Sequence, residues 1–337
     1  KKRNIHRREE YYADAVFGTL IEAPTHADFG QLRSSGLSRV LGTRAVVFQD
    51  ETFRLRPGDS AVLERMFLRL AVELKGTDRV RVSAICEDAG FVDGRVRQLH
   101  SRRWWVRLAA AQKLGVMRSG RATLPLTEAL NDRNRDVRLG ALRSLASIGD
   151  PASYEDVLAA MRDEMKWESS VISEIVLTLG TPICLPILER MRSTPELILT
   201  AGYVKSLGLL REHAAVVSLL PLLEDNEHLR LEAIHALGHI GDGRVVPGLV
   251  SYLCDPLPEI RAATAEALGR LQEPCVIVGL RGLLSDHDRS VRYASAVALT
   301  KLDCPGLRML KDIEYDNEPL AQGIAQQVLA EHRIGLH

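Results

Sequence analysis

The chain has 337 residues, of which 46% are hydrophobic and 26% are charged, and its 44 Lys and Arg residues balance its 44 Asp and Glu residues. These values exclude a wholly disordered chain, and a net charge of zero argues against a strongly basic nucleic-acid-binding protein. Only 5% of the residues are aromatic. This composition favours a helical protein.

The cysteines argue against a disulfide framework or a zinc cage, because their number is odd and none forms a C-x-x-C pair. We expect each of them to be a small core residue, in a reducing compartment such as the cytoplasm. They are Cys86, Cys184, Cys254, Cys275 and Cys304.

The N-terminus is basic, with five Lys and Arg residues between Lys1 and Arg8. Under the positive-inside rule, such a cluster follows the cytoplasmic end of a membrane helix. We therefore expect an anchor before Lys1 and a location on the cytoplasmic side of the inner membrane. The alternatives are the basic start of a soluble helix and a trimmed leader. The sequence itself has no run of 18 apolar residues, so we expect no membrane-spanning helix within it.

Residues 1–77 are predicted to form an N-terminal, juxtamembrane capping segment, and residues 78–337 a repeat domain. Within the first segment we expect a helix over Tyr11–Leu20, then a loop-rich stretch, then a helix over Asp59–Lys75. A break at Gly76 starts the next helix. The segment covers the first repeat, since the ends of stacked repeats must be capped.

A phrase of about 31 residues recurs through the second segment. It contains an Asp, then Val-Arg or a relative, then an Ala-rich stretch that ends in Leu-Gly. The arginines set the period, because the steps from Arg107 to Arg138, from Arg230 to Arg261 and from Arg261 to Arg292 are each 31 residues. Two degenerate copies fill the gap in the middle, and a last copy near the C-terminus brings the number to eight.

Each copy is predicted to hold two helices, the first of them short and often opening with proline, which a first helical turn tolerates. The Asp lies in the turn, where its carboxylate can accept from free N–H groups of the second helix. In one such helix Val291, Ser295 and Leu299 share a face. A single pair cannot bury that face, so the copies stack into an all-α solenoid.

The phrase resembles the short HEAT-like repeats of phycobilin lyases and of many bacterial proteins, over roughly residues 80–337. The resemblance implies an all-α solenoid of about eight helical-hairpin repeats. It also implies that the repeated Arg and Asp residues join adjacent repeats by hydrogen bonds and ion pairs. The residues expected in this inter-repeat role are Arg107, Arg138, Arg230, Arg261, Arg292, Asp132, Asp225, Asp255 and Asp286.

The basic start, the capping segment and the motif Ser101–Arg107 together resemble bacterial HEAT-repeat proteins with an N-terminal membrane anchor. Some of those proteins are linked with surface-polysaccharide glycosyltransferases. The resemblance implies a non-enzymatic scaffold for protein–protein interaction, formed by the cytoplasmic domain of an anchored protein and supporting such a system.

Enzymatic motifs are missing from the sequence: it has no phosphate-binding loop, no dinucleotide fingerprint, no H-E-x-x-H and no G-x-S-x-G. A related HEAT-repeat enzyme, the hydroxylase of deoxyhypusine, binds two irons through His-Glu pairs. The nearest equivalent is Leu231-Glu232, where leucine stands in place of histidine. We therefore expect no catalytic residue, no cofactor and no small-molecule substrate.

Three residues suggest a metal site, because Glu232, His235 and His239 are spaced to share one helix face and imidazole and carboxylate both suit transition metals. In the repeat register, however, the two histidines occupy positions that carry solvent-facing residues in sister repeats. We therefore expect no metal at this place.

The partner-binding surface is predicted on the concave face, which second helices line. Its side chains vary from repeat to repeat, as suits a protein partner with a mixed surface, although a merely solvated face is an equal alternative. The candidates are Leu139, Arg143, Leu231, His235, His239, Arg270, Tyr293, Val297 and Lys301.

Trp104 and Trp105 are a further candidate, as an aromatic hot spot. We favour the alternative that they pack against the capping segment.

Two other functions compete with the scaffold: a HEAT-like DNA glycosylase and a phycobilin lyase-like factor. The charge distribution disfavours nucleic acid, because residues 1–120 carry 22 basic and 14 acidic residues whereas residues 121–337 carry 22 and 30. The basic end suits an anionic membrane surface. The membrane-like start does not fit the lyase.

Overall fold

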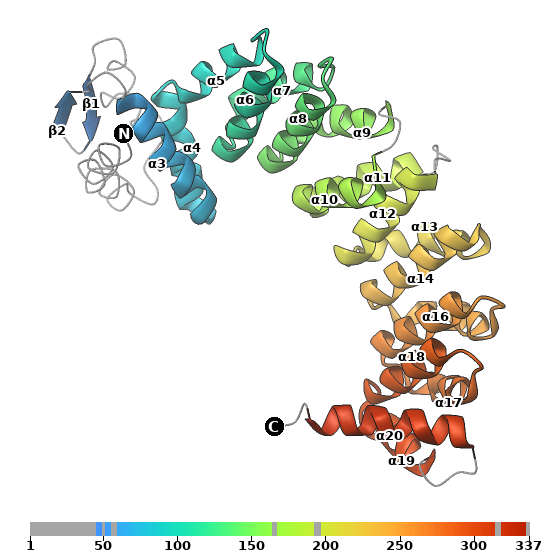
Figure 1. Ribbon diagram of the computed structural model, residues 1–337. Helices are drawn as coiled ribbons and strands as arrows, with labels where there is room; N and C mark the ends of the chain where they lie inside the picture. The colour runs from blue at the N-terminus through green and yellow to red at the C-terminus, as the bar shows by residue number, and fades with distance from the viewer. Residues whose placement is uncertain are drawn as a thin grey trace. The chain divides into compact units, whose positions relative to one another are not determined.

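The computed structural model (Figure 1) describes residues 45–48, 51–54, 59–163, 167–191, 197–313 and 318–334. The chain divides into two compact units, Lys1–Ala160 (unit 1) and Met161–His337 (unit 2). The basic cluster Lys1–Arg8 and the predicted helix Tyr11–Leu20 lie outside the described residues. The boundary predicted between residues 77 and 78 stays a prediction.

The described part of unit 1 begins with two antiparallel strands, a hairpin in which Val46 pairs with Phe53. The hairpin is absent from the all-helical prediction, and its β-branched and aromatic residues account for it. Helices follow, and the predicted helix near Asp59 and the break at Gly76 are confirmed. The elements are β1 (Ala45–Phe48), β2 (Glu51–Arg54), α3 (Asp59–Glu73), α4 (Gly76–Asp88), α5 (Phe91–Leu99), α6 (Trp104–Met117), α7 (Thr123–Ala129), α8 (Arg135–Ile148) and α9 (Tyr154–Asp163), which runs across the boundary.

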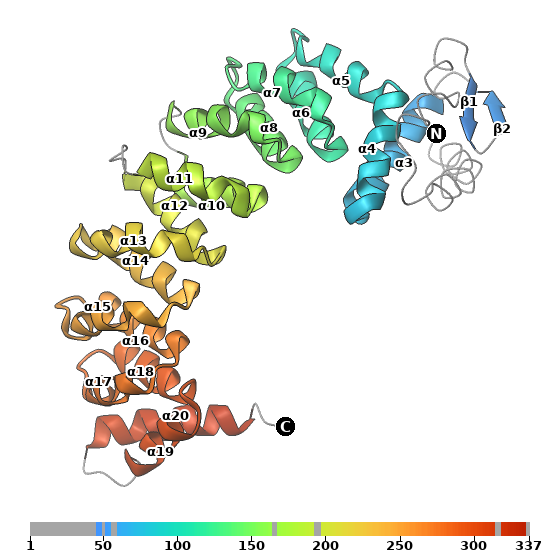
Figure 2. The same ribbon diagram turned by 180° about the vertical axis from the view of Figure 1, so that it is seen from behind.

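Unit 2 continues the alternation of short first helices and longer second helices. Figures 1 and 2 show α14, α16 and α18 along one side of this unit and α13, α15 and α17 along the other, with α19 and α20 at the C-terminal end. Its helices are α10 (Ser169–Leu179), α11 (Cys184–Met191), α12 (Leu197–Leu209), α13 (Val216–Leu219), α14 (Glu227–Ile240), α15 (Val246–Val250), α16 (Pro258–Leu271), α17 (Ile277–Gly282), α18 (Arg289–Thr300), α19 (Asp303–Ile313) and α20 (Pro319–Ile334).

The even-numbered helices from α6 to α20 are therefore the second helices of eight repeats in the described part of the chain, the number that the sequence predicts. Their apolar stripe forms the core: Val291, Ser295 and Leu299 are fully buried, as expected from their spacing. Neighbouring second helices pack on one another, α6 on α8 in unit 1 and α10 through α20 in unit 2. Apart from the hairpin, the described chain is an all-α solenoid of stacked helical hairpins, as predicted.

The Leu-Gly that ends the repeat phrase is explained by helix packing. A Cβ atom on Gly238 would lie 2.7 Å from the Cα of Ala267 on the next second helix, and one on Gly269 would lie 2.7 Å from the Cα of Ala298. Glycine against alanine therefore lets α14, α16 and α18 approach more closely than two larger residues would.

The carboxylate of the repeated Asp accepts from the N–H group of the residue two positions later, which lies just before the second helix begins. The carboxylate of Asp132 accepts from the N–H of Asn134 at 2.8 Å, and that of Asp286 accepts from the N–H of Asp288 at 2.8 Å. The first N–H groups of the helices go instead to Asn134 and Asp288, which are the N-caps of α8 and α18. The prediction that the Asp itself caps the second helix is wrong for these repeats.

Two cysteines, Cys86 and Cys184, are buried as expected, whereas Cys254, Cys275 and Cys304 are exposed, so the core prediction is wrong for those three. In the described ranges no single helix is long and apolar enough to cross a membrane. Two consecutive segments, Ser169–Leu179 and Thr181–Met191, are together long and apolar enough for a membrane span, but the chain bends by 110° between them.

Candidate partner-binding surface

Arg107 on α6 joins two repeats of unit 1. Its Nε and Nη2 atoms donate to the two carboxylate oxygens of Asp132 at 2.6 and 2.7 Å, and its Nη1 donates to the carbonyl oxygen of Ser101 at 2.8 Å. The hydrogen bond from Arg107 lowers the pKa of the Asp132 carboxyl below its usual value. A fork of this kind fixes direction as well as distance, so it holds α6 in register with the turn before α8.

Unit 2 repeats this bridge 25 residues apart in sequence. The Nε and Nη2 atoms of Arg261 each donate to Asp286 at 2.8 Å, while its Nη1 donates to the carbonyl oxygen of Asp255 at 2.8 Å. Arg230 reaches Asp255 with one Nη1 hydrogen bond of 3.2 Å and lies over the ring of Tyr252. The bridges fix the relative positions of second helices, and hence of the side chains that these helices expose.

Arg138 and Arg292 each donate to the carbonyl oxygen of the Asp in their own turn, to Asp132 at 2.7 Å and to Asp286 at 2.6 Å. Asp163, 25 residues after Arg138, is the last residue of α9, and the residue 25 positions after Arg292 is Asn317, which lies outside the described residues. Asp225 departs from the predicted role: in the described chain no arginine donates to its carboxylate, which accepts instead from the N–H of Asn226. The reason is that position 200, 25 residues earlier, is Thr200.

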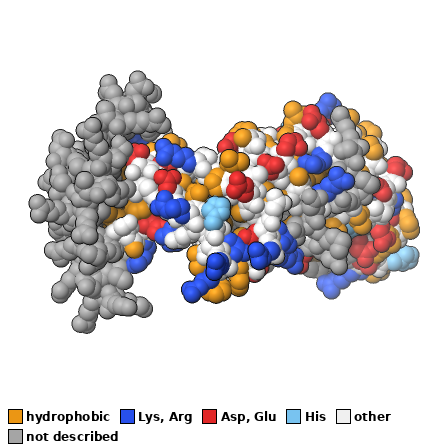
Figure 3. Space-filling view, turned by 90° about the horizontal axis from the view of Figure 1, so that it is seen from above, with side chains coloured by type: hydrophobic (Ala, Val, Ile, Leu, Met, Phe, Trp, Pro, Cys, Tyr) orange, Lys and Arg blue, Asp and Glu red, His pale blue; other side chains and the backbone are white. Residues whose placement is uncertain are grey.

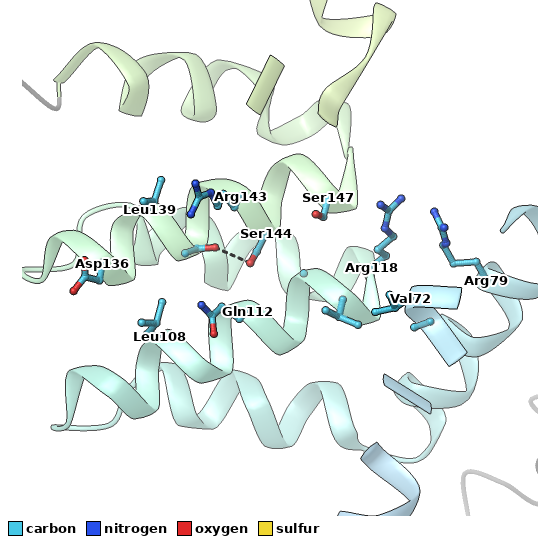
Figure 4. Close-up of a pocket in the computed structure, with 14 residues that line it drawn as sticks. Val72, Arg79, Leu108, Gln112, Arg118, Asp136, Leu139, Arg143, Ser144 and Ser147 are labelled. Carbon is cyan, nitrogen blue, oxygen red and sulfur yellow. Dashed lines mark hydrogen bonds between the residues drawn. The ribbon is translucent and has the colours of Figure 1, made fainter. Parts of the chain in front are cut away.

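Leu139 and Arg143, predicted on the concave face, line a groove of about 510 Å³ on the second-helix side of unit 1 (Figure 4). Its side chains come from four helices, α3, α4, α6 and α8, and from the residue that follows α6. We call this site the unit 1 groove. It is lined by Ala71, Val72, Arg79, Leu108, Gln112, Gly115, Val116, Arg118, Asp136, Leu139, Gly140, Arg143, Ser144 and Ser147.

Small residues keep the floor of the unit 1 groove open. A Cβ atom on Gly140 would lie 2.6 Å from Cδ1 of Leu108, and one on Gly115 would lie 2.6 Å from Oγ of Ser144. The Ser144 hydroxyl is itself satisfied, because its single O–H can donate to the carbonyl oxygen of either Ala111 or Gly140, at 2.8 and 2.7 Å. At Ser144, the floor of the groove therefore presents no unpaired polar atom to a ligand, and its contribution is the space that the small residues leave.

Two arginines at one end of the groove were not among the predicted residues. Arg118 follows α6 in a left-handed conformation, with φ of 51°, and Arg79 lies on α4. Figure 4 shows their guanidinium groups side by side. Desolvation lowers the pKa of Arg118, and the positive charge of Arg79 lowers it further. The repeated motif contains no signal for this pair, because Arg79 precedes the first copy and Arg118 follows the Leu114-Gly115 that ends it.

In unit 2 the structure brings His235 and His239 of α14 together with Glu266 and Arg270 of α16. Burial lowers the pKa of His235, against the carboxylates of Glu266 and Glu232, which raise it. Burial also lowers the pKa of His239, helped by the charge of Arg270. Both imidazoles are therefore held toward the neutral form on a half-buried part of the second-helix side.

The other predicted residues of unit 2 lie on the same series of helices or, for Lys301, directly after one of them. Tyr293 on α18 is 40% exposed, and its hydroxyl donates to Glu331 on α20 at 3.0 Å. Leu231, Val297 and Lys301 are each half-buried.

A second groove, of about 550 Å³, lies elsewhere in unit 2, and none of the predicted binding residues lines it. Its lining includes Val217 of α13, which is among the most exposed apolar residues of the described chain, and Asp225 and Leu229 at the turn into α14.

The two tryptophans are more exposed than packing against a cap would leave them, at 40% for Trp104 and 53% for Trp105. Their rings meet edge to face, and the guanidinium of Arg103 lies 5.7 Å from the centre of the Trp105 ring. Figure 3 shows Lys and Arg side chains, in blue, beside hydrophobic ones, in orange, over the described part of unit 1.

Within the ranges that the structure describes, no three His, Cys, Asp or Glu residues are arranged to hold a metal ion. This includes Glu232, His235 and His239, whose spacing suggested one.

The family model for HEAT repeats matches residues 92–180, 216–300 and 246–330, which together make up more than half of the chain. No curated protein sequence is significantly similar to it.

Solved structures with similar folds have low sequence identity. One is Kap95p in a study of its binding to RanGDP, with 13% identity over 79% of this chain and a TM-score of 0.45; the match covers 46% of Kap95p, so this chain spans less than half of it. Human deoxyhypusine hydroxylase has 21% identity over 82% of this chain and all of its own, with a TM-score of 0.31. CpcE–CpcF, the phycocyanin lyase of Nostoc sp. PCC7120, has 21% identity over 72% and 87%, with a TM-score of 0.33.

Proposed function

The chain belongs to the HEAT-repeat family, and on that basis we propose that it is a non-enzymatic scaffold that binds a partner protein through the exposed side of its second helices. The observation that carries the proposal is the unit 1 groove, which four helices line and in which α6 and α8 place Leu108, Gln112 and Leu139 along one open cleft. Stacked repeats commonly use this side for binding.

The proposal extends to location. We place the scaffold on the cytoplasmic side of a bacterial inner membrane, with a surface-polysaccharide glycosyltransferase system as its partner. The location rests on the basic cluster Lys1–Arg8, and the partner rests on the sequence resemblance. Trp104 and Trp105 support the location, since exposed tryptophans beside arginines suit the interface of an anionic membrane.

Site-specific photocrosslinking in the native cell tests the scaffold. We expect benzoylphenylalanine at Leu139 or Tyr293, both on second helices, to form an adduct with one partner protein. The matched controls are Leu124 on α7 and Val278 on α17, which are 71% and 79% exposed but lie on first helices. Adducts of equal yield at all four positions, or none at the first two, would contradict the proposal.

Vesicle binding tests the location. The protein is expected to bind phosphatidylserine vesicles more tightly than neutral ones, in a salt-sensitive manner. Replacing both Trp104 and Trp105 by alanine is expected to weaken this binding at least about tenfold, since burying the exposed part of the two rings is worth about 1.4 kcal/mol or more. Binding that ignores lipid charge and both tryptophans would count against a membrane-proximal role.

A further inference from the structure

We propose that the unit 1 groove binds an acidic segment of the partner protein, with carboxylates against Arg79 and Arg118 and an aliphatic side chain against Leu108 and Leu139. The inference rests on the proposed function and adds the chemistry of the segment that is bound.

The arginine pair carries the first step. Two guanidinium groups lie side by side at one end of the groove (Figure 4), and no Asp or Glu of the described chain forms an ion pair with either of them. Arg79 donates its Nε to the carbonyl oxygen of Leu74 at 2.8 Å, which positions the side chain and leaves its positive charge in place. Like charges held together repel, so a carboxylate placed between them relieves a repulsion as well as forming hydrogen bonds.

The apolar part of the groove carries the second step. Leu108 and Leu139 are only half-buried, and Val72 beside the arginines is 67% exposed. These side chains extend the site beyond the charged end, so a ligand that covers both must be amphipathic.

The third argument is the uneven distribution of charge along the groove. Among the described residues that line the groove, Asp136 is the only acidic one, and Figure 4 shows it at the end away from Arg79 and Arg118. A bound segment therefore has a preferred direction, with its acidic side chains toward α4 and its aliphatic ones toward the start of α8.

The size and chemistry of the site favour a protein segment. The volume of about 510 Å³ is that of an ordinary ligand cleft, and the guanidinium fork matches a carboxylate. A nucleic-acid backbone would need a long row of cations, and the described lining holds only three arginines among leucines, valines and small residues.

Selection from random dodecapeptides displayed on phage tests the inference on the full chain. We expect peptides that combine Asp or Glu with Leu, Ile, Val or Phe. The synthetic consensus peptide should bind the Arg79→Gln and Arg118→Gln variants about tenfold more weakly each, as expected for loss of a charge-assisted hydrogen bond. Leu139→Ser should also weaken binding. The matched control is Arg97→Gln, an exposed arginine on α5 outside the groove, with equal melting of all variants checked by circular dichroism.

Several results would overturn the inference: enrichment of basic peptides, no enrichment, or equal affinity of the acidic peptide for the wild type and for the Arg79→Gln, Arg118→Gln double variant. If that double variant instead loses binding to phosphatidylserine vesicles while peptide binding is unchanged, the arginines serve the membrane. Photocrosslinking separates this failure from that of the scaffold. An unchanged adduct at Leu139 in the double variant would contradict the acidic segment but not the scaffold. The absence of an adduct at any position would contradict both proposals.

Discussion

At the scale of single residues, the Arg–Asp bridges explain why the repeat phrase keeps these two residue types. The side chains of Arg261 and Asp286 are only 16% and 10% exposed, so their hydrogen bonds compete weakly with water. Each arginine also satisfies a carbonyl oxygen of its own turn. One arginine side chain thus holds its own turn in place and joins it to the next repeat. Lysine could not do the same, because it lacks the planar fork of N–H groups that binds both carboxylate oxygens.

The bridges make stability depend on pH in a defined direction. Burial works to raise the pKa of Asp286, but hydrogen bonds from Arg261 and from the N–H of Asp288 lower it overall, and Arg107 lowers that of Asp132. A depressed folded pKa means that the stabilisation is complete above the unfolded value of about 4 and is lost as the pH falls through the folded value.

Asp286→Asn keeps the turn hydrogen bond and removes the ion pair. We expect it to cost about 2 kcal/mol at neutral pH, the size of a charge-assisted hydrogen bond, and progressively less as the pH falls below about 4 toward the lowered pKa of the folded wild type, because the wild type then loses the same stabilisation. Urea unfolding of both proteins across this range measures the difference. A cost that is constant with pH would show that the loss is steric.

At the scale of helices, spacing is set by the smallest residues. Gly238 and Gly269 each face an alanine of the next second helix at a distance that excludes a Cβ atom. Because this contact is between backbones, no side-chain rotation can relieve it.

Gly238→Ala is therefore expected to destabilise unit 2 by about 1–3 kcal/mol, the usual range for overpacking a core. The matched control is Gly323→Ala in α20, where nothing lies within 4 Å of the new Cβ and where alanine should stabilise the helix by up to about 1 kcal/mol. Thermal unfolding of the two variants measures whether each substitution raises or lowers the stability of the protein. Equal effects from both would show that helix propensity, not packing, decides.

The repeat helices were predictable because their apolar spacing and period are local in sequence. Leu139 and Arg143 could be placed on the groove for the same reason, since their register follows from Arg138. Arg79 and Arg118 could not, because they meet only after α4 packs beside the end of α6. The exposed Trp104 and Trp105 were misplaced, since a hydrophobic pair predicts burial whenever its neighbours are unknown.

At the scale of the whole molecule, zero net charge is a cancellation between a basic first third and an acidic remainder. The unit 1 groove lies mostly in the basic part, with Arg79, Arg118 and Arg143 in its lining. An acidic partner segment would therefore be steered toward unit 1 and away from unit 2, which adds to the local preference of the arginine pair.

The division into two compact units predicts separate responses to local damage, since each repeat of a solenoid contacts only its neighbours. In Gly238→Ala, we expect hydrogen exchange to accelerate most in α12, α14 and α16 and less along α18 and α20. Exchange in α6 and α8 of unit 1 should stay at the wild-type rate, and Gly323→Ala should accelerate none of these helices. Exchange of the full-length protein, followed by digestion and mass spectrometry of the peptides, measures the rates of all these helices in one experiment. Equal acceleration in α6 and α14 would mean that the two units open as one, and that damage at α14 also loosens the groove.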